Sequence, residues 1–236
     1  MSTSGRADAV LHRDPPRVAT VLSHDSPVVR ILRVLFGMIG FSTVIINIFI
    51  VANLPEGLHL PNYLSFFTNE VNLFAGAVLV LSGALPRDRL PRWWDGLRGA
   101  AAVYLSVTFV VFALLLENSP AAGTITPWVN FVVHRLMPVV LVLDWLLIPA
   151  SSPARWWRPL AWIAYPVLFV VYSLLRGSVV DWYPYPFLDP RGPEGYASLI
   201  ASAGAVFVGS LAAALLFDQL GRLRRRLAPR AAREAV

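Results

Sequence analysis

The stretch VLFGMIGFSTVIINIFIVA, residues 34–52, decides the class of fold because it runs for 19 residues without a charged side chain. A helix rises about 1.5 Å per residue, so this stretch is long enough to cross the hydrocarbon core of a bilayer, which is about 30 Å thick. We expect it to form a first, uncleaved membrane span.

The composition of the whole chain is that of a membrane protein. Hydrophobic residues make up 56% of the 236 residues, charged residues make up 14%, and the mean hydropathy is +0.60. Soluble domains have about 25% charged residues. Five further apolar stretches follow the first, at about 63–85, 99–116, 128–148, 159–175 and 196–217. The sequence therefore predicts an all-α polytopic membrane protein, a six-transmembrane-helix bundle formed by one domain over residues 30–218.

Polar tails flank the predicted bundle. Residues 1–29 are rich in Ser, Pro, Arg and Asp and show no sustained apolar period, which predicts a disordered tail. Residues 219–236 form a second tail that is rich in Arg. The last predicted span is rich in Ala, Gly and Ser, which are residues that allow close contact between membrane helices.

The distribution of arginine predicts the orientation. All 20 basic residues are Arg, and 17 of them lie in the two flanks of the bundle (residues 1–33 and 222–236) and in the second-to-third and fourth-to-fifth connections. The other three, Arg135, Arg176 and Arg191, lie towards the opposite side. Cytoplasmic flanks carry the excess of basic residues, so we expect six spans in the cell membrane with both termini in the cytoplasm.

Several kinds of chemistry are not expected. The chain has no cysteine, which excludes disulfides and cysteine nucleophiles. Its histidines (His12, His24, His59 and His134) show no paired metal-ligand spacing, and there is no Gly-rich phosphate loop. We expect no metal and no cofactor. The charges lie beside the predicted spans, which does not favour a nucleic-acid partner.

A hydroxyl and an imidazole are expected at the same depth. Given the predicted orientation, Thr68 lies roughly 7 Å and His134 roughly 9 Å below the outer starts of their spans. Asn72 follows Thr68 by one helical turn, and Asn130 precedes His134 by one turn, so each pair shares a helix face. The same outer layer contains further polar residues: Asn47, Asn69, Glu70, Arg135 and Arg176.

Structural roles also account for these residues. Thr often bonds to its own helix backbone, and Asn and His link neighbouring membrane helices. Glu70 is expected either to pair with Arg135 or Arg176 or to contact lipid headgroups. Arg135 alternatively extends its charged end to the membrane interface by snorkelling. Asp144 lies roughly 15 Å from the outer layer, where we expect an interfacial anchor or a partner for Arg155.

The functional interpretation is acyl transfer. Thr68 as nucleophile and His134 as general base form the pairing that attacks an ester carbonyl. The candidates for contacting the substrate or stabilising an oxyanion are Asn47, Asn69, Asn72, Asn130 and Arg135.

Two stretches carry a resemblance to a known family. Phe67-Thr68-Asn69 with Asn72, and the stretch 130–138, resemble the signature stretches of the androgen-induced and androgen-dependent transmembrane proteins and of their bacterial six-helix relatives. The stretch 182–187 resembles the connection before the last helix of the bacterial members. The animal proteins are threonine hydrolases that cleave fatty acid esters of hydroxy fatty acids. The resemblance implies Thr68 as nucleophile, His134 as base, a lipid-like substrate and a bacterial inner-membrane location.

Other functions stay open at this level. A non-catalytic six-helix protein that binds a lipid, a small solute or a partner fits the same pattern, and so does a transporter. The aromatic and proline-rich stretch 181–190 is either a lid over the outer layer or an interfacial anchor. The sequence does not specify the oligomeric state.

Overall fold

The described residues form six long helical segments, as the sequence predicts. The computed structural model describes residues 23–118, 126–192 and 195–227, and within these residues it contains helices and no strand. The segments that are long and apolar enough to cross a membrane are Pro27–Ala52 (α2), Phe67–Ala84 (α4), Trp94–Leu116 (α5 Trp94–Val111 and η2 Phe112–Leu116), Pro127–Leu147 (α6 Pro127–Phe131, η4 Val132–Leu136 and α7 Met137–Leu147), Arg158–Val180 (α8) and Gly195–Leu227 (α9).

Large apolar side chains on the outside of the bundle support a membrane location. On α2, Ile31 and Phe49 are 65% and 66% exposed, and Ile200 on α9 is 67% exposed. Soluble monomers rarely expose contiguous apolar surface on this scale. The all-α, multi-pass membrane architecture is therefore confirmed.

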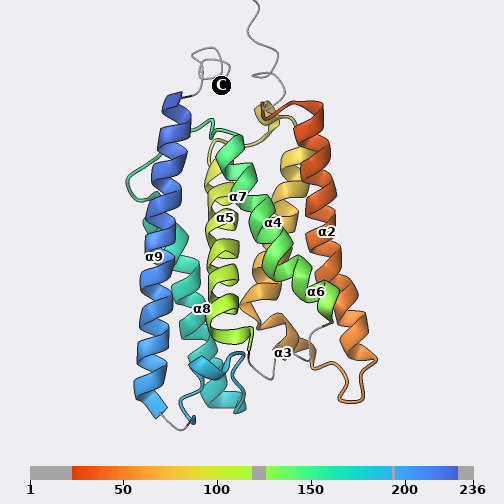
Figure 1. Ribbon diagram of the computed structural model, residues 1–236, viewed down its shortest axis with the longest axis vertical. Coiled ribbons are helices and arrows are strands. Elements are labelled where there is room, and N and C mark those ends of the chain that lie inside the picture. Colours follow the sequence, from red (N-terminus) through yellow and green to blue (C-terminus); the bar gives the residue numbers. More distant parts are fainter. Residues whose placement is uncertain (1–22, 119–125, 193–194, 228–236) are drawn as a thin grey trace, which may run out of the picture.

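The bundle has two distinct ends (Figure 1). The start of α2 and the end of α9 lie at one end, which we call the tail end. The short helices α3 (Leu60–Leu64) and η5 (Pro186–Leu188) lie at the other, together with the start of α4; we call this the site end. An even number of spans brings both ends of the described helical chain to one side.

Glycines bring α2 and α4 into close contact. A Cβ atom on Gly37 would lie 2.8 Å from the carbonyl oxygen of Gly76, and one on Gly83 would lie 2.4 Å from that of Arg30. Neither distance is sterically possible, so these positions require glycine. On α9, whose composition predicts such contacts, a Cβ atom on Gly204 or Gly209 would have no neighbour within 4 Å. Glycine therefore brings α2 and α4 together, and not the part of α9 whose composition predicts such contacts.

The helices at the tail end begin earlier and end later than predicted. Pro27 opens α2 in the first turn, where its missing N–H costs nothing, so Arg30 and Arg33 belong to the first span. His24 and Ser26 are buried, and the predicted disordered tail is therefore wrong for residues 23–29. Residues 1–22 lie outside the described residues, as do residues 228–236 of the predicted C-terminal tail, whose earlier part continues α9 to Leu227.

A buried ion cluster joins three helices at the tail end. Asp144 accepts hydrogen bonds from Arg33 at 2.6 Å and from Arg98 at 2.8 Å, and Arg98 also donates to Asp95 at 3.0 Å. Arg155, the expected partner of Asp144, instead lies over the ring of Trp157. Burial of a charge requires a paired, hydrogen-bonded partner. Some arginines that the sequence places in flanks therefore act inside the bundle.

Candidate functional site

Thr68 and His134 meet at the site end. Thr68 lies in the first turn of α4, and His134 lies in η4. The Thr68 Oγ1 atom is 3.4 Å from His134 Nε2, and both side chains are buried. Depth along the spans could not predict that the two side chains would also face each other, because depth does not determine how a helix is rotated about its axis.

Asn130 determines which nitrogen of His134 carries the hydrogen. The Asn130 Oδ1 atom is 2.7 Å from His134 Nδ1, and an amide oxygen only accepts hydrogen bonds. In the neutral ring, Nδ1 therefore carries the hydrogen and Nε2 presents a lone pair to the Thr68 hydroxyl. This is the tautomer that a general base requires.

A π-helical turn, η4, lies just before Pro138 and orients the His134 side chain. Met137 N–H donates to the carbonyl of Val132, five residues earlier, instead of to Val133. Pro138 has no N–H to offer the Val133 carbonyl. Asn72 of α4 takes its place by donating from Nδ2 to Val133 O at 3.2 Å and to Thr68 O at 2.8 Å. The widened turn is thus joined to the helix that carries Thr68.

A second π-helical turn holds the other face of the imidazole. Phe112 begins η2, and its ring stacks on His134 with centroids 3.8 Å apart and an interplanar angle of 17°. π-Helical turns are rare and are found mostly at functional sites. In this protein the two π-helical turns, η2 and η4, contact each other through the stacked rings of Phe112 and His134.

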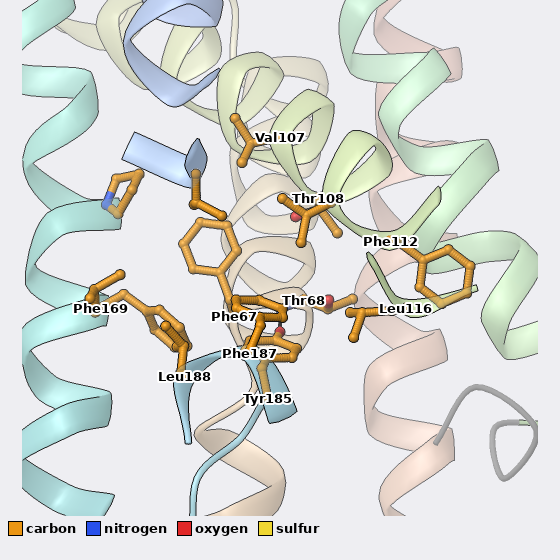
Figure 2. Close-up of a pocket in the computed structure, with 14 residues that line it drawn as sticks. Phe67, Thr68, Val107, Thr108, Phe112, Leu116, Phe169, Tyr185, Phe187 and Leu188 are labelled. Atoms are coloured by element: carbon orange, nitrogen blue, oxygen red, sulfur yellow. Dashed lines mark hydrogen bonds between the residues drawn. The ribbon is translucent and has the colours of Figure 1, made fainter. Parts of the chain in front are cut away.

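Thr68 borders an apolar cavity (Figure 2). The cavity has a volume of about 50 Å³, whereas one water needs about 10–15 Å³ on the same measure. Apart from Thr68, Thr108 and Tyr185, its walls are hydrophobic; they comprise Phe67, Val107, Val111, Phe112, Leu116, Pro166, Phe169, Val170, Phe187, Leu188 and Val206. Thr68 thus borders a space suited to hydrocarbon.

The stretch 181–190 folds over this cavity. Asp181 ends α8 in the left-handed conformation, with φ 56°, and the chain then turns so that Tyr183 packs directly on Gly177. Tyr185 and Leu188 are buried and line the cavity. Arg191 closes the stretch by donating to Asp189 at 2.7 Å and to the Asp181 carboxylate. We call residues 181–191 the cover.

Tyr185 brings a third polar group to the site. The Thr68 backbone N–H donates to the Tyr185 hydroxyl oxygen at 3.4 Å. Burial raises the pKa of Tyr185 above its usual value, so the phenol stays protonated and keeps a hydrogen to donate. Sequence reasoning singles out the stretch 181–190 but misses Tyr185 as a site residue, because nothing in the composition indicates which aromatic ring turns inward.

Three predicted asparagines have other partners. Asn47 donates to the Tyr63 hydroxyl at 3.1 Å, and Asn69 donates to the Tyr63 carbonyl at 2.8 Å, so both stabilise α3. Both hydrogen bonds of Asn72 come from its amide nitrogen, which leaves that group no role as an oxyanion donor in this conformation. Among the expected donors, only Asn130 is hydrogen-bonded to a side chain of the Thr68–His134 pair, and it accepts through its oxygen.

The charged residues of the outer layer pair differently from the prediction. Glu70 accepts a short hydrogen bond from Tyr165 rather than pairing with Arg135 or Arg176. Arg135 is bonded to Glu117, and both side chains are substantially exposed. Arg176 donates to Asn62 at 2.6 Å. None of these charges lines the cavity.

In the parts of the chain that the structure describes, no three His, Cys, Asp or Glu side chains gather closely enough to hold a metal ion. Comparisons with protein-family models, with curated proteins and with solved structures gave no match.

Proposed function

We propose that the protein is an integral-membrane hydrolase of fatty acyl esters, with Thr68 as nucleophile and His134 as general base. The observation that carries the proposal is the hydrogen-bonded chain Asn130–His134–Thr68, which ends at a residue that borders an apolar cavity. A nucleophile, a base and a residue that orients the base are the recurring parts of acyl-transfer sites. The resemblance to threonine hydrolases supports the same roles.

The first half of the reaction forms an acyl-threonine. The Thr68 Oγ1 atom attacks the ester carbonyl carbon while its proton passes to His134 Nε2. The Tyr185 hydroxyl, which is 3.4 Å from the Thr68 backbone nitrogen, donates a hydrogen bond to the negatively charged former carbonyl oxygen. The intermediate then expels the alcohol, which takes the proton from His134.

The second half returns the enzyme to its starting state. Water gives a proton to His134 Nε2 and attacks the acyl carbon, and the ester bond to Thr68 breaks. The carboxylic acid leaves, and the proton returns from His134 to the Thr68 oxygen. The asparagine that accepts from Nδ1 stabilises the doubly protonated ring in both halves.

A groove on the lipid side supports an acyl substrate. It lies between α8 and α9, has a volume of about 150 Å³ and is almost wholly apolar. Pro166, Val170 and Val206 line both this groove and the Thr68 cavity. An acyl chain entering from the membrane would pass these three residues to reach the hydroxyl.

The arginine distribution supports the orientation. With the tail end in the cytoplasm of a bacterial inner membrane, the Thr68 site opens towards the outer leaflet, and the excess of arginine lies on the inside as the positive-inside rule requires. Membrane lipids are then both the surroundings of the protein and the source of its substrate.

One observation favours a second candidate, non-catalytic binding of a lipid or small solute. The Thr68–His134 distance of 3.4 Å is longer than the usual 2.7–3.2 Å for such hydrogen bonds. A catalytic contact of this length must shorten when substrate binds, whereas a binding protein needs no such change.

Labelling with a lipophilic fluorophosphonate separates the two candidates. We expect the purified protein to be labelled at Thr68, and labelling to disappear in Thr68→Ala and to slow by about 10²–10⁴-fold in His134→Ala. Thr108→Val is the matched control, because Thr108 lines the same cavity but bonds its own helix at Tyr104 O. Labelling that persists in Thr68→Ala, or no labelling at all, would count against catalysis by this residue.

A further inference from the structure

A second cavity lies at the tail end of the bundle, whereas Thr68 lies at the site end. It has a volume of about 220 Å³ and is formed by the start of α8, the last turns of α9 and the connection before α8. Its lining residues are Ala150, Ser152, Pro153, Ala154, Arg158, Gly221, Arg222, Arg225 and Arg226. We call it the arginine cavity. It is several times larger than the cavity at Thr68.

Positive charge in the arginine cavity exceeds negative charge. Asp218 accepts from Arg158 and from Arg222, at 2.7 Å each, so one carboxylate serves two guanidinium groups. Arg225 is bonded to the carbonyl oxygens of Ala150 and Ser151, which carry no net charge. Arg226 makes no ion pair with any residue that the structure describes.

The position of Arg158 makes this a built site. Arg158 is only 8% exposed; Asp218 and the rings of Trp145 and Trp162 hold it in place. Arg158 lines the cavity, and its Nη2 atom lies 3.5 Å from where a Cβ on Gly221 would lie. A Cβ on Gly221 would lie only 2.6 Å from the Trp145 ring, so glycine at position 221 lets α9 pack closely against the residues that hold Arg158.

We propose that the arginine cavity binds a phosphate group. Arginine recognises phosphate through parallel N–H donors with fixed geometry, and basic pockets between membrane helices on the cytoplasmic side are suited to anionic headgroups. The phosphate could belong to an anionic phospholipid or be free in solution. This inference does not depend on the reaction proposed for Thr68.

Helix termination alone does not account for the cluster. Basic side chains near a helix C-terminus commonly bond terminal carbonyls, and Arg224 of α9 donates at 3.3 Å to Leu147 O, the last carbonyl of α7. Arg224 does not line the arginine cavity. Arg224 and Arg226 lie in the same helical turn and carry the same charge, but only Arg226 lines the arginine cavity. Arg224 is therefore a matched control for Arg226.

The experiment measures phosphate binding by the full-length protein purified in a neutral detergent. Thermal unfolding is followed with added phosphatidylglycerol, with phosphatidylcholine, and with inorganic phosphate against sodium chloride at equal ionic strength. The proteins are wild type, Arg226→Gln, Arg225→Gln and the control Arg224→Gln. Since Arg226 loses no ion pair to a described residue, Arg226→Gln is expected to fold normally.

Wild type and Arg224→Gln should be stabilised, whereas Arg226→Gln and Arg225→Gln should need roughly 10- to 100-fold more ligand for the same shift. Stabilisation by phosphatidylglycerol alone identifies a lipid headgroup, and stabilisation by inorganic phosphate as well identifies phosphate itself. The proposal is overturned if neither ligand stabilises wild type, if Arg226→Gln responds like wild type, or if Arg224→Gln loses as much as Arg226→Gln.

Discussion

At the scale of single residues, Asn130 controls how His134 can act. The amide oxygen accepts from Nδ1 at 2.7 Å, and Asn130 itself does not line the cavity. Asn130 is therefore a positioning residue in the proposed reaction, and its effect should pass through the orientation and tautomer of the imidazole.

Asn130→Ala tests this positioning role. We expect fluorophosphonate labelling to slow by roughly tenfold or more, but by less than the loss of about 10²–10⁴-fold for removing a general base. Asn130→Asp should restore much of the rate, because a carboxylate oxygen accepts the same Nδ1 hydrogen. Equal rates in wild type and Asn130→Ala would show that the contact is only structural.

His24 makes the stability of the bundle depend on pH. Burial first, and the nearby positive charges of Arg33 and Arg98 second, lower the pKa of His24 from 6.5 to about 3. The folded protein therefore resists protonation at this position between these two values, while the unfolded chain accepts the proton. Stability is fully present above pH 6.5 and is lost as the pH falls towards 3.

We expect the free energy of unfolding to fall by about 2 kcal/mol between about pH 7 and about pH 5. Thermal unfolding in detergent across this range measures the change, and His24→Gln should give a flatter profile because it removes the titrating group. If the two proteins have the same pH dependence, His24 is not the group responsible.

At the scale of the helical elements, the π-helical turn before Pro138 is what aims His134. Pro138 cannot donate to a carbonyl of this turn, and the turn is stabilised where Asn72 donates to Val133 O. A regular α-helix over the same residues would rotate His134 with respect to α7 and shift it along the axis.

Pro138→Ala should therefore separate stability from activity. The new N–H restores a donor to the preceding turn, so we expect an unchanged or higher melting temperature. Labelling at Thr68 should fall by roughly tenfold or more as Nε2 moves from the hydroxyl. Full labelling in a folded Pro138→Ala protein would show that the turn does not determine the geometry of the site.

At the scale of the whole molecule, the ion cluster holds the tail end together. Asp144 on α7 joins Arg33 on α2 and Arg98 on α5. Breaking one partner of a buried ion pair is costly because the other charges stay buried.

Asp144→Ala should lower the free energy of unfolding by about 3–5 kcal/mol. Thermal or denaturant unfolding in detergent measures this change. Asp181→Asn is the control, since Asp181 is paired with Arg191 on an exposed surface, where ion pairs contribute little. If Asp144→Ala and the control are equally stable, the cluster does not hold the helices.

The sequence predicted the global architecture better than the details of packing. Hydropathy gives the number of spans, because burial in lipid requires length and apolarity, and the described residues contain six such helices. It misplaced the start of α2, because Arg33 is accommodated inside the bundle by Asp144, a partner 111 residues away. Hydropathy scales treat such an arginine as the end of a span.

The candidate site was predictable only in part, because the sequence gives the depth of a residue along its span but not the direction in which its side chain points. Thr68 and His134 share a depth that follows from counting residues along two spans. Their facing orientation depends on the π-helical turn, for which Pro138 was a signal in the sequence. The inward position of Tyr185 depends on how the cover folds back from Asp181, and that is a tertiary contact without a local pattern.

The glycine contact between α2 and α4 has a consequence for mutational tolerance. Gly37, Gly76 and Gly83 carry no chemistry, yet no side chain fits at these positions. A survey scored by the amount of folded protein would mark them as intolerant and should tolerate Thr68→Ala, because a smaller side chain fits there without a clash. A survey scored by the proposed hydrolysis should mark both kinds of position. The difference between the two surveys would separate the residues that form the bundle from those that act within it.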